Sequence, residues 1–315
     1  EYDAEIFKWY EKKLSSKNNK SFFLSGSKIN SLRYGENPHQ KASIYSNSLN
    51  NQGNFYNQLN GKELSFNNLN DLNTALSLLS EFKEPTSVII KHAIPCGVAE
   101  SKNIYLAWRK SFLVDSLSAF GGVVALNRKV EKKLALDLSK IFLEVIVAKD
   151  FSKEALEIFK TKPNLRIITV KSLSMFKTSK PKQVITIANT FLVQDRDHFS
   201  TNKSNTKIVS EKKPTKREMD DLIFANKVVK HVRSNAIVIA KNKTTIGIGS
   251  GNTSRVDSVK FAIEKSKRVQ LIKATKILSG SVMASDAFFP FTDSIKLATK
   301  SGIKSIIQPG GSIKD

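Results

Sequence analysis

The adjacent residues Lys91 and His92 form the pair in this sequence that best suits acid–base chemistry. A neutral imidazole can take a proton from a weakly acidic nucleophile near neutral pH. A neighbouring ammonium group can stabilise negative charge that grows on an oxygen atom. Residue types and spacing alone nevertheless favour a plainer interpretation, in which a surface lysine precedes a buried, hydrogen-bonded histidine.

The position of this pair along the chain adds to its interest. The short apolar run 87–90 predicts a buried strand that ends at Lys91. Ligands of open α/β sheets bind beyond the carboxyl ends of the strands. Consecutive side chains of a strand start on opposite faces, so a turn must bring Lys91 and His92 together. We expect Pro95-Cys96-Gly97 to force that turn.

Strands alternating with helices of about ten residues are expected to hold the pair in place, which indicates an α/β fold with a largely parallel sheet. Apolar periodicity predicts helices at 2–14, 69–82, 103–113, 130–142, 152–160, 215–231, 254–267 and 293–301. Strands are expected at 87–90, 123–126, 145–148, 165–170, 236–241, 244–249 and 305–308. Polar stretches predict a linker at 15–21 and loops at 171–182 and 198–213.

The length of 315 residues exceeds the usual size of one hydrophobic core, so we expect two lobes, both of them α/β. No sequence repeat between the lobes is evident. The chain begins without Met and stops at Asp315 soon after a glycine turn, so we expect a piece of a longer protein.

Composition narrows the classes of function. Lys and Arg number 51 against 28 Asp and Glu, a formal charge of +23 that could attract nucleotides, polycarboxylates or nucleic acid. The charges are spread along the chain, and abundant Lys, Asn, Ile and Ser indicate a compositional bias. No zinc-finger spacing, RNP-like strand or dense basic block is present, so we expect no specific nucleic-acid partner.

The single cysteine, Cys96, excludes a disulfide framework and a multi-thiolate zinc site. Pro95-Cys96 resembles part of the zinc-deaminase pattern, but that pattern needs H-x-E and P-C-x-x-C, and Ile94 and Ala99 break it. We therefore expect no metal. No apolar run approaches the roughly 20 residues needed to cross a bilayer, and no secretion signal is evident, so we expect a cytoplasmic protein without membrane contact.

Three further segments could bind ligands. In segment 32–40, Arg33 could grip a phosphate and Tyr34 could stack or donate a hydrogen bond, although a plain loop explains it as well. Glycines in 246–252 precede a helix start that could hold an anion, but the spacing fits neither a dinucleotide nor a Walker motif. The aromatic residues of 285–291 are more often core than ligand platform.

Six segments, in this order, together resemble one family, the 5-aminoimidazole-4-carboxamide ribonucleotide (AICAR) formyltransferase region of bifunctional purine-biosynthesis enzymes. They read LRYGENPHQ, QLNGKELS, VIIKHAIPCGVA, SAFGGVVAL, SVMASDAFFPFTD and IIQPGGSIKD, at residues 32–40, 58–65, 88–99, 118–126, 281–293 and 306–315. The resemblance runs from about residue 30 to the end. Ile94, Ser116 and Lys149 depart from the family's usual Asn, Pro and Pro.

This resemblance implies formyl transfer from 10-formyltetrahydrofolate to the 5-amino group of AICAR. His92 would be the general base, and Lys91 would stabilise the developing oxyanion. Implied contacts to the ribonucleotide fall on Arg33, Tyr34, Asn68, Gly121, Glu144, Asn235 and Arg255. Implied contacts to the folate fall on Val256, Phe288, Asp293, Ser312 and Ile313.

The resemblance also implies two cytidine-deaminase-like α/β lobes with mixed sheets, and a homodimer with its sites at the subunit interface. Residues 1–30 would be a C-terminal remnant of a cyclohydrolase domain with a linker, 31–200 the first lobe, and 201–315 an incomplete second lobe. Cyclohydrolase activity is therefore not expected. Two alternatives stay open at this point: an inactive fragment, and a basic nucleic-acid-binding protein.

Overall fold

The structure, a computed structural model, describes residues 2, 6, 9, 10, 22, 24–46, 55–177, 182–270 and 277–311. The four described residues of the helix expected at 2–14 are helical, and the linker expected at 15–21 lies outside the described residues. None of the helices in the described part of the chain combines the length and apolarity needed to cross a bilayer.

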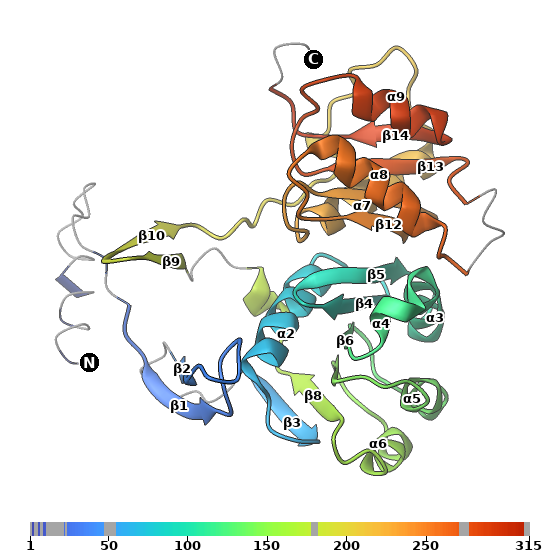
Figure 1. Cartoon of the computed structure of the whole chain (residues 1–315). Coiled ribbons are helices and arrows are strands. Elements are labelled where there is room, and N and C mark those ends of the chain that lie inside the picture. The colour runs from blue at the N-terminus through green and yellow to red at the C-terminus, as the bar shows by residue number, and fades with distance from the viewer. Residues whose placement is uncertain are drawn as a thin grey trace.

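A ten-stranded mixed sheet organises the molecule, in the order β14-β13-β11-β12-β5-β4-β6-β7-β8-β3 (Figure 1). Its strands are β3 (Tyr56–Asn60), β4 (Thr86–Lys91), β5 (Ile94–Glu100), β6 (Val123–Leu126), β7 (Val145–Ala148), β8 (Arg166–Val170), β11 (Ile237–Lys241), β12 (Thr244–Gly249), β13 (Ser281–Ser285) and β14 (Ile303–Ile307). The α/β class and the mixed sheet are confirmed.

The expectation of a largely parallel sheet is wrong. Only the pairs β6–β7, β7–β8 and β13–β14 are parallel, and the other neighbours in the ten-stranded sheet run antiparallel. The reason lies in two tight hairpins, β4–β5 and β11–β12. A two-residue connection can join only antiparallel strands, whereas a parallel pair needs a long crossover.

The helices of the described residues agree with the predicted ones to within three residues at each end, except that the short helix at 116–119 was not predicted. They are α2 (Phe66–Leu79), α3 (Ile104–Val114), α4 (Ser116–Ala119), α5 (Lys132–Ser139), α6 (Lys153–Lys160), α7 (Lys216–Val229), α8 (Arg255–Ser266) and α9 (Asp293–Lys300), with 3-10 turns η1 (Leu173–Phe176) and η2 (Lys203–Asn205). Helix α2 begins three residues before the predicted start because Ser65 and Asn68 form a capping box there.

Two hairpins stand apart from the large sheet. One pairs β1 (Ser27–Leu32) with β2 (Ala42–Ser46), and the other pairs β9 (Gln183–Ile187) with β10 (Thr190–Gln194). Figure 1 shows the β9–β10 hairpin as an arm that reaches away from the ten-stranded sheet. The sequence predicted neither hairpin. The residues of β1–β2 are mostly half-buried, whereas β9–β10 is largely exposed to solvent.

Alternate residues of the strands face different cores. Ile90 packs with α2 and α7 in one cluster that runs across both halves of the sheet, whereas Ile89 packs on the opposite face with α3, α5 and α6. Helices α8 and α9 cover that opposite face over β11 and β13. One core spans both halves of the sheet and so marks no boundary between two lobes. The proposed division at residue 200 stays a prediction.

The structure contains an internal repeat that the sequence did not reveal. The order helix, strand, two-residue turn, strand, helix occurs as α2–β4–β5–α3 and again as α7–β11–β12–α8. Ser65 and Thr215 cap the first helices, each in a capping box. His92 and Ala93 make the first turn, and Asn242 and Lys243 make the second, all with positive φ. Few residue types are shared, which is why the repeat is hard to see in the sequence.

Candidate functional site

Lys91 and His92 lie at the tip of the β4–β5 hairpin. Lys91 ends β4, and His92 and Ala93 form the turn with φ of 53° and 58°. Two-residue turns of type I′ require positive φ at both central residues. The turn expected at Pro95-Cys96-Gly97 is therefore wrong, since these residues lie within β5. Gly97 serves another purpose, because a Cβ there would lie 2.0 Å from the carbonyl oxygen of Ser111 in α3.

The exposure of the pair contradicts the plainer interpretation. His92 is exposed, and Lys91 is the half-buried member. The Nζ of Lys91 donates a hydrogen bond of 2.6 Å to the carbonyl oxygen of Phe120. A buried, hydrogen-bonded histidine beside a surface lysine is thus wrong at this position. The imidazole is accessible, and the ammonium group is held in one place.

Both side chains line a cavity of about 340 Å³ between the two repeats. Asp115 and Lys265 form an ion pair of 2.5 Å in its wall, and Ser118 also donates to Asp115. Burial, followed by the charge of Asp115, raises the pKa of the Cys96 thiol to about 12. A thiol that stays protonated at neutral pH is a poor nucleophile. The cavity therefore offers His92, and not Cys96, as its proton acceptor.

A second, larger cavity of about 950 Å³ begins where Phe120 lies. Four of the seven residues implied as ribonucleotide contacts line it, namely Arg33, Tyr34, Asn68 and Glu144. Its lining also carries the cationic residues Lys62, Lys140, Lys162 and Arg166. Several cations around one open cavity suit a phosphate-bearing ligand.

A glycine turn connects the two cavities. Gly121 has a φ of 72° and donates its N–H to the carbonyl oxygen of Phe142 at 2.8 Å. The rings of Phe120 and Phe142 consequently lie 5.0 Å apart, at the rim of the larger cavity. Gly121 itself thus shapes the backbone between Lys91 and that cavity, and its direct contact to ribonucleotide stays a prediction.

Glu144 and Asn68 have structural partners of their own. Glu144 forms an ion pair of 2.6 Å with Arg166, which also donates to the carbonyl oxygen of Glu63 at 3.1 Å. The carboxamide oxygen of Asn68 accepts the N–H of Ser65 at 3.2 Å in the helix cap. Any ligand contact by these two side chains has to coexist with these bonds.

The QLNGKELS segment builds one wall of the larger cavity. Asn60 donates to the carbonyl oxygen of Leu165 at 2.9 Å. Gly61 has a φ of 97°, and a Cβ there would lie 2.3 Å from the same oxygen. This close approach brings Lys62 beside Arg166. Neither cation was predicted from the sequence, because the β3–β8 pairing that joins them spans more than a hundred residues.

Asn235 and Arg255 form a separate group in the second repeat. Arg255 donates to Asn235 Oδ1 at 2.7 Å and to Ser285 Oγ at 2.9 Å, and it pairs with Asp286. Burial alone would raise the pKa of Asp286, but hydrogen bonds from Ser234 and Arg255 lower it. Neither Asn235 nor Arg255 lines either cavity. The structure therefore does not bring these two residues to the other implied contacts within one chain.

The residues implied as folate contacts lie near this second group or outside the described residues. Val256 follows Arg255 in α8, and Phe288 is 39% exposed beyond β13. Asp293 begins α9, and its carboxylate accepts the N–H of Ser294 at 2.6 Å. Ser312 and Ile313 lie outside the described residues. Within the part of the chain that the structure describes, no group of three or more His, Cys, Asp and Glu could hold a metal ion.

Comparison with known proteins gives this arrangement a context. A family model described as the AICARFT/IMPCHase bienzyme matches residues 1–265. The chain is 47% identical to the bifunctional purine biosynthesis proteins PurH of Caldicellulosiruptor saccharolyticus and Trichodesmium erythraeum, and 44% identical to that of Bacillus thuringiensis. Each alignment covers 100% of this chain and 60% of the relative, so the chain spans about three fifths of the length of these relatives.

Proposed function

Because the chain belongs to the AICARFT/IMPCHase bienzyme family, we propose that it transfers a formyl group from 10-formyltetrahydrofolate to the 5-amino group of AICAR in purine biosynthesis. One observation carries the proposal. An exposed His92 and a fixed Lys91 ammonium meet at the tip of a hairpin, beside a cavity rich in cations. We propose a cytoplasmic location, as befits a purine-biosynthesis enzyme.

The chemistry follows from the two side chains. The 5-amino nitrogen attacks the formyl carbon, and the carbonyl electrons move onto its oxygen. His92 accepts the proton that the nitrogen loses. An ammonium group has three donors, so Lys91 can keep its bond to Phe120 and still donate to the oxyanion. When the oxyanion collapses, the bond from carbon to N10 of the folate breaks, and tetrahydrofolate leaves with a proton.

Two separate groups of ribonucleotide contacts support a site that is shared between subunits. Arg33, Tyr34 and Glu144 line the larger cavity, whereas Asn235 and Arg255 lie in neither cavity. In a homodimer, the first group of one subunit meets the second group of its partner. The 10-formyltetrahydrofolate then enters from the side of Phe288 and Asp293.

Replacing the catalytic pair tests the proposal directly. We expect Lys91→Ala and His92→Ala each to lower the rate of tetrahydrofolate release from AICAR and 10-formyltetrahydrofolate by at least ~100-fold, the usual scale for a proton-transfer or oxyanion group. The assay uses the chain of 315 residues and a version extended to the length of its relatives.

The second repeat supplies matched controls. Lys241 also donates its Nζ to a backbone carbonyl, that of Ser279, at 2.6 Å, and Asn242 occupies the same place in its turn as His92. We expect Lys241→Ala and Asn242→Ala to keep the rate within about threefold, because neither lines the 340 Å³ or the 950 Å³ cavity. Unchanged turnover in His92→Ala, or no turnover in the extended protein, contradicts the proposed function.

A further inference from the structure

The two tight turns of the internal repeat share a strained backbone. His92 and Ala93 have φ of 53° and 58°, and Asn242 and Lys243 have φ of 51° and 53°. Residues with a Cβ avoid this left-handed region, so the rest of the structure has to hold them there. In type I′ turns this strain is usually removed by asparagine or glycine. His92 and Ala93 are neither, so another group has to stabilise the turn at the catalytic pair.

A carboxylate performs this role in each repeat, and it is half-buried in the first and buried in the second. Asp71, in α2, accepts the backbone N–H of Ala93 at 2.6 Å, and the backbone N–H of His92 faces the same carboxylate. Asp221, in α7, accepts the backbone N–H of Asn242 at 2.9 Å and that of Lys243 at 2.7 Å. Each aspartate follows the N-cap of its helix by six residues, Ser65 in one case and Thr215 in the other. The same device thus fixes both turns.

The two repeats differ in what their turns carry. The first turn presents an imidazole at a cavity, and the second presents an amide away from both cavities. We infer that Asp71 is a positioning residue for His92, which fixes the turn so that the imidazole stands where the attacking nitrogen loses its proton. Asp221 is its structural twin and has no part in the reaction. The catalytic half of this inference rests on the proposed function, whereas the fixing of the turn does not.

The geometry explains why a carboxylate is needed. Two N–H groups point at one side chain, and a carboxylate can accept both because it has only acceptor atoms. An asparagine of the same size would turn its own NH2 group toward one of these donors. The turn would then lose a hydrogen bond and gain a repulsive contact. A displacement of about 1 Å at a catalytic group is enough to cost about 100-fold in rate.

Asp71→Asn and Asp221→Asn form a matched pair of variants. In the chain extended to the length of its relatives, we expect D71N to lower kcat by about 10- to 100-fold, with KM for AICAR within about threefold. D221N is expected to keep kcat within about twofold. It is expected to lower Tm by about as much as D71N does. Hydrogen exchange of the backbone amides of His92 and Ala93 is expected to accelerate in D71N only.

A double variant separates positioning from general damage. Glycine enters the left-handed region without strain. The double variant D71N/A93G is therefore expected to fold and to have a kcat at least about threefold higher than that of D71N. Equal losses of kcat in D71N and D221N, or no recovery in D71N/A93G, would overturn the inference. Failure of the proposed function looks different: the unaltered chain then has no turnover, while the exchange of the His92 and Ala93 amides still reports whether Asp71 fixes the turn.

Discussion

Arg255 offers a single-residue test of the second group of ribonucleotide contacts that we propose. Its guanidinium joins Asn235 to Ser285 and Asp286, which lie on two different segments. A planar guanidinium can donate in several fixed directions, whereas a lysine ammonium on a flexible stem cannot reproduce that geometry. We expect Arg255→Lys to raise KM for AICAR by about 10-fold with a smaller change in kcat, as measured by initial rates.

An exposed arginine supplies the comparison. Arg268 lies just beyond the end of α8 and lines neither cavity. Arg268→Lys is expected to leave KM unchanged within about twofold. If Arg255→Lys and Arg268→Lys change KM for AICAR equally, Arg255 has only a structural role. The proposed second group of ribonucleotide contacts is then contradicted.

The sequence predicted the strand that ends at Lys91 better than the turn that follows it. The catalytic role of Lys91 and His92 rests on the family motifs around them and stays a prediction. Pro95 and Gly97 looked like the turn, yet Gly97 is needed for the close approach of α3, and the left-handed turn falls on His92 and Ala93. Neighbours in sequence do not reveal such a turn, because a carboxylate on a separate helix fixes it.

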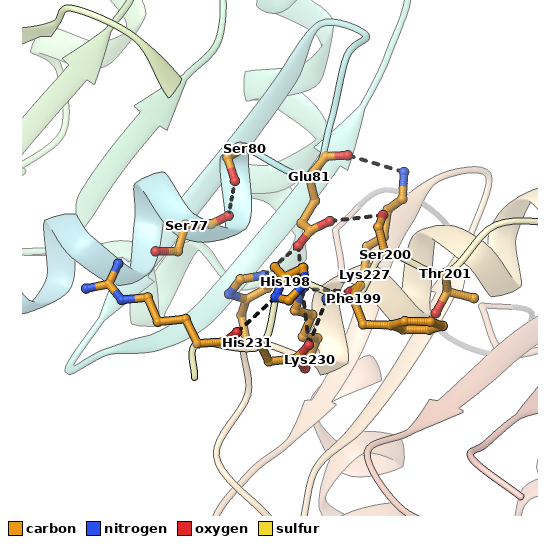
Figure 2. A network of polar contacts seen from close by, with 12 residues as sticks. Ser77, Ser80, Glu81, His198, Phe199, Ser200, Thr201, Lys227, Lys230 and His231 are labelled. Carbon is orange, nitrogen blue, oxygen red and sulfur yellow. Dashed lines mark hydrogen bonds and ion pairs between the residues drawn. The ribbon is translucent and has the colours of Figure 1, made fainter. Parts of the chain in front are cut away.

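Helices α2 and α7 meet at their carboxyl ends through Glu81, as Figure 2 shows. The carboxylate of Glu81 lies 2.9 Å from Nζ of Lys230 and 3.4 Å from Nε2 of His231, and only 9% of the side chain is exposed. Lys227 donates to the backbone carbonyl of Glu81 at 3.2 Å. Burial alone would raise the pKa of Glu81, but hydrogen bonds from His231 and Lys230 lower it from 4.5 to about 2.

This contact predicts a defined dependence of stability on pH. A carboxyl group with a lowered pKa in the folded state stabilises the fold above its unfolded pKa, and this stabilisation is lost as the pH falls from about 4.5 to 2. We expect Glu81→Gln to lower the free energy of unfolding at pH 7 by about 1–3 kcal/mol, and the difference from the unaltered chain to shrink through that pH range. Urea denaturation measured from pH 7 to pH 3 checks it.

Glu157 serves as the control for this prediction. It pairs with Lys160 at 2.6 Å, but 68% of its side chain is exposed. Exposed ion pairs contribute little, so Glu157→Gln is expected to change the free energy of unfolding by less than about 0.5 kcal/mol. A difference between Glu81→Gln and the unaltered chain that is the same at pH 3 and pH 7 contradicts the role of the charge.

Elements were predicted well where a run of apolar residues in the sequence indicates a buried strand. Strands β6 and β7 match at both ends, since they are short runs of buried apolar residues. Strand β13 was missed, although all of its residues are buried, because small polar residues stand at both of its ends. Strand β3 was missed because its residues are mostly polar and only partly buried, and its pairing with β8 is long-range. Long-range pairing leaves no local signal in a sequence.

At the scale of the whole molecule, the positive charge and the exposed apolar side chains each favour a binding partner. Five cationic residues line the larger cavity, which is consistent with the formal charge of +23 attracting anionic ligands. The β9–β10 arm carries exposed apolar side chains. Ile185 and Leu192 pair across the arm and therefore share one face with Ile187, and each is 48–57% exposed. Apolar side chains on an exposed hairpin suit burial against a second subunit.

Leu192→Asp tests whether this face holds two subunits together. A charge in the middle of an apolar interface costs desolvation. At one and the same concentration we therefore expect the unaltered chain to sediment as a dimer and the variant as a monomer. Its rate of tetrahydrofolate release is expected to fall by at least about 10-fold, because in the shared site that we propose each subunit then lacks Asn235 and Arg255 of its partner. Thr186→Asp, exposed on the opposite face of the same arm, is expected to stay dimeric and active. A fully active Leu192→Asp monomer contradicts the shared site and leaves the formyl transfer itself intact.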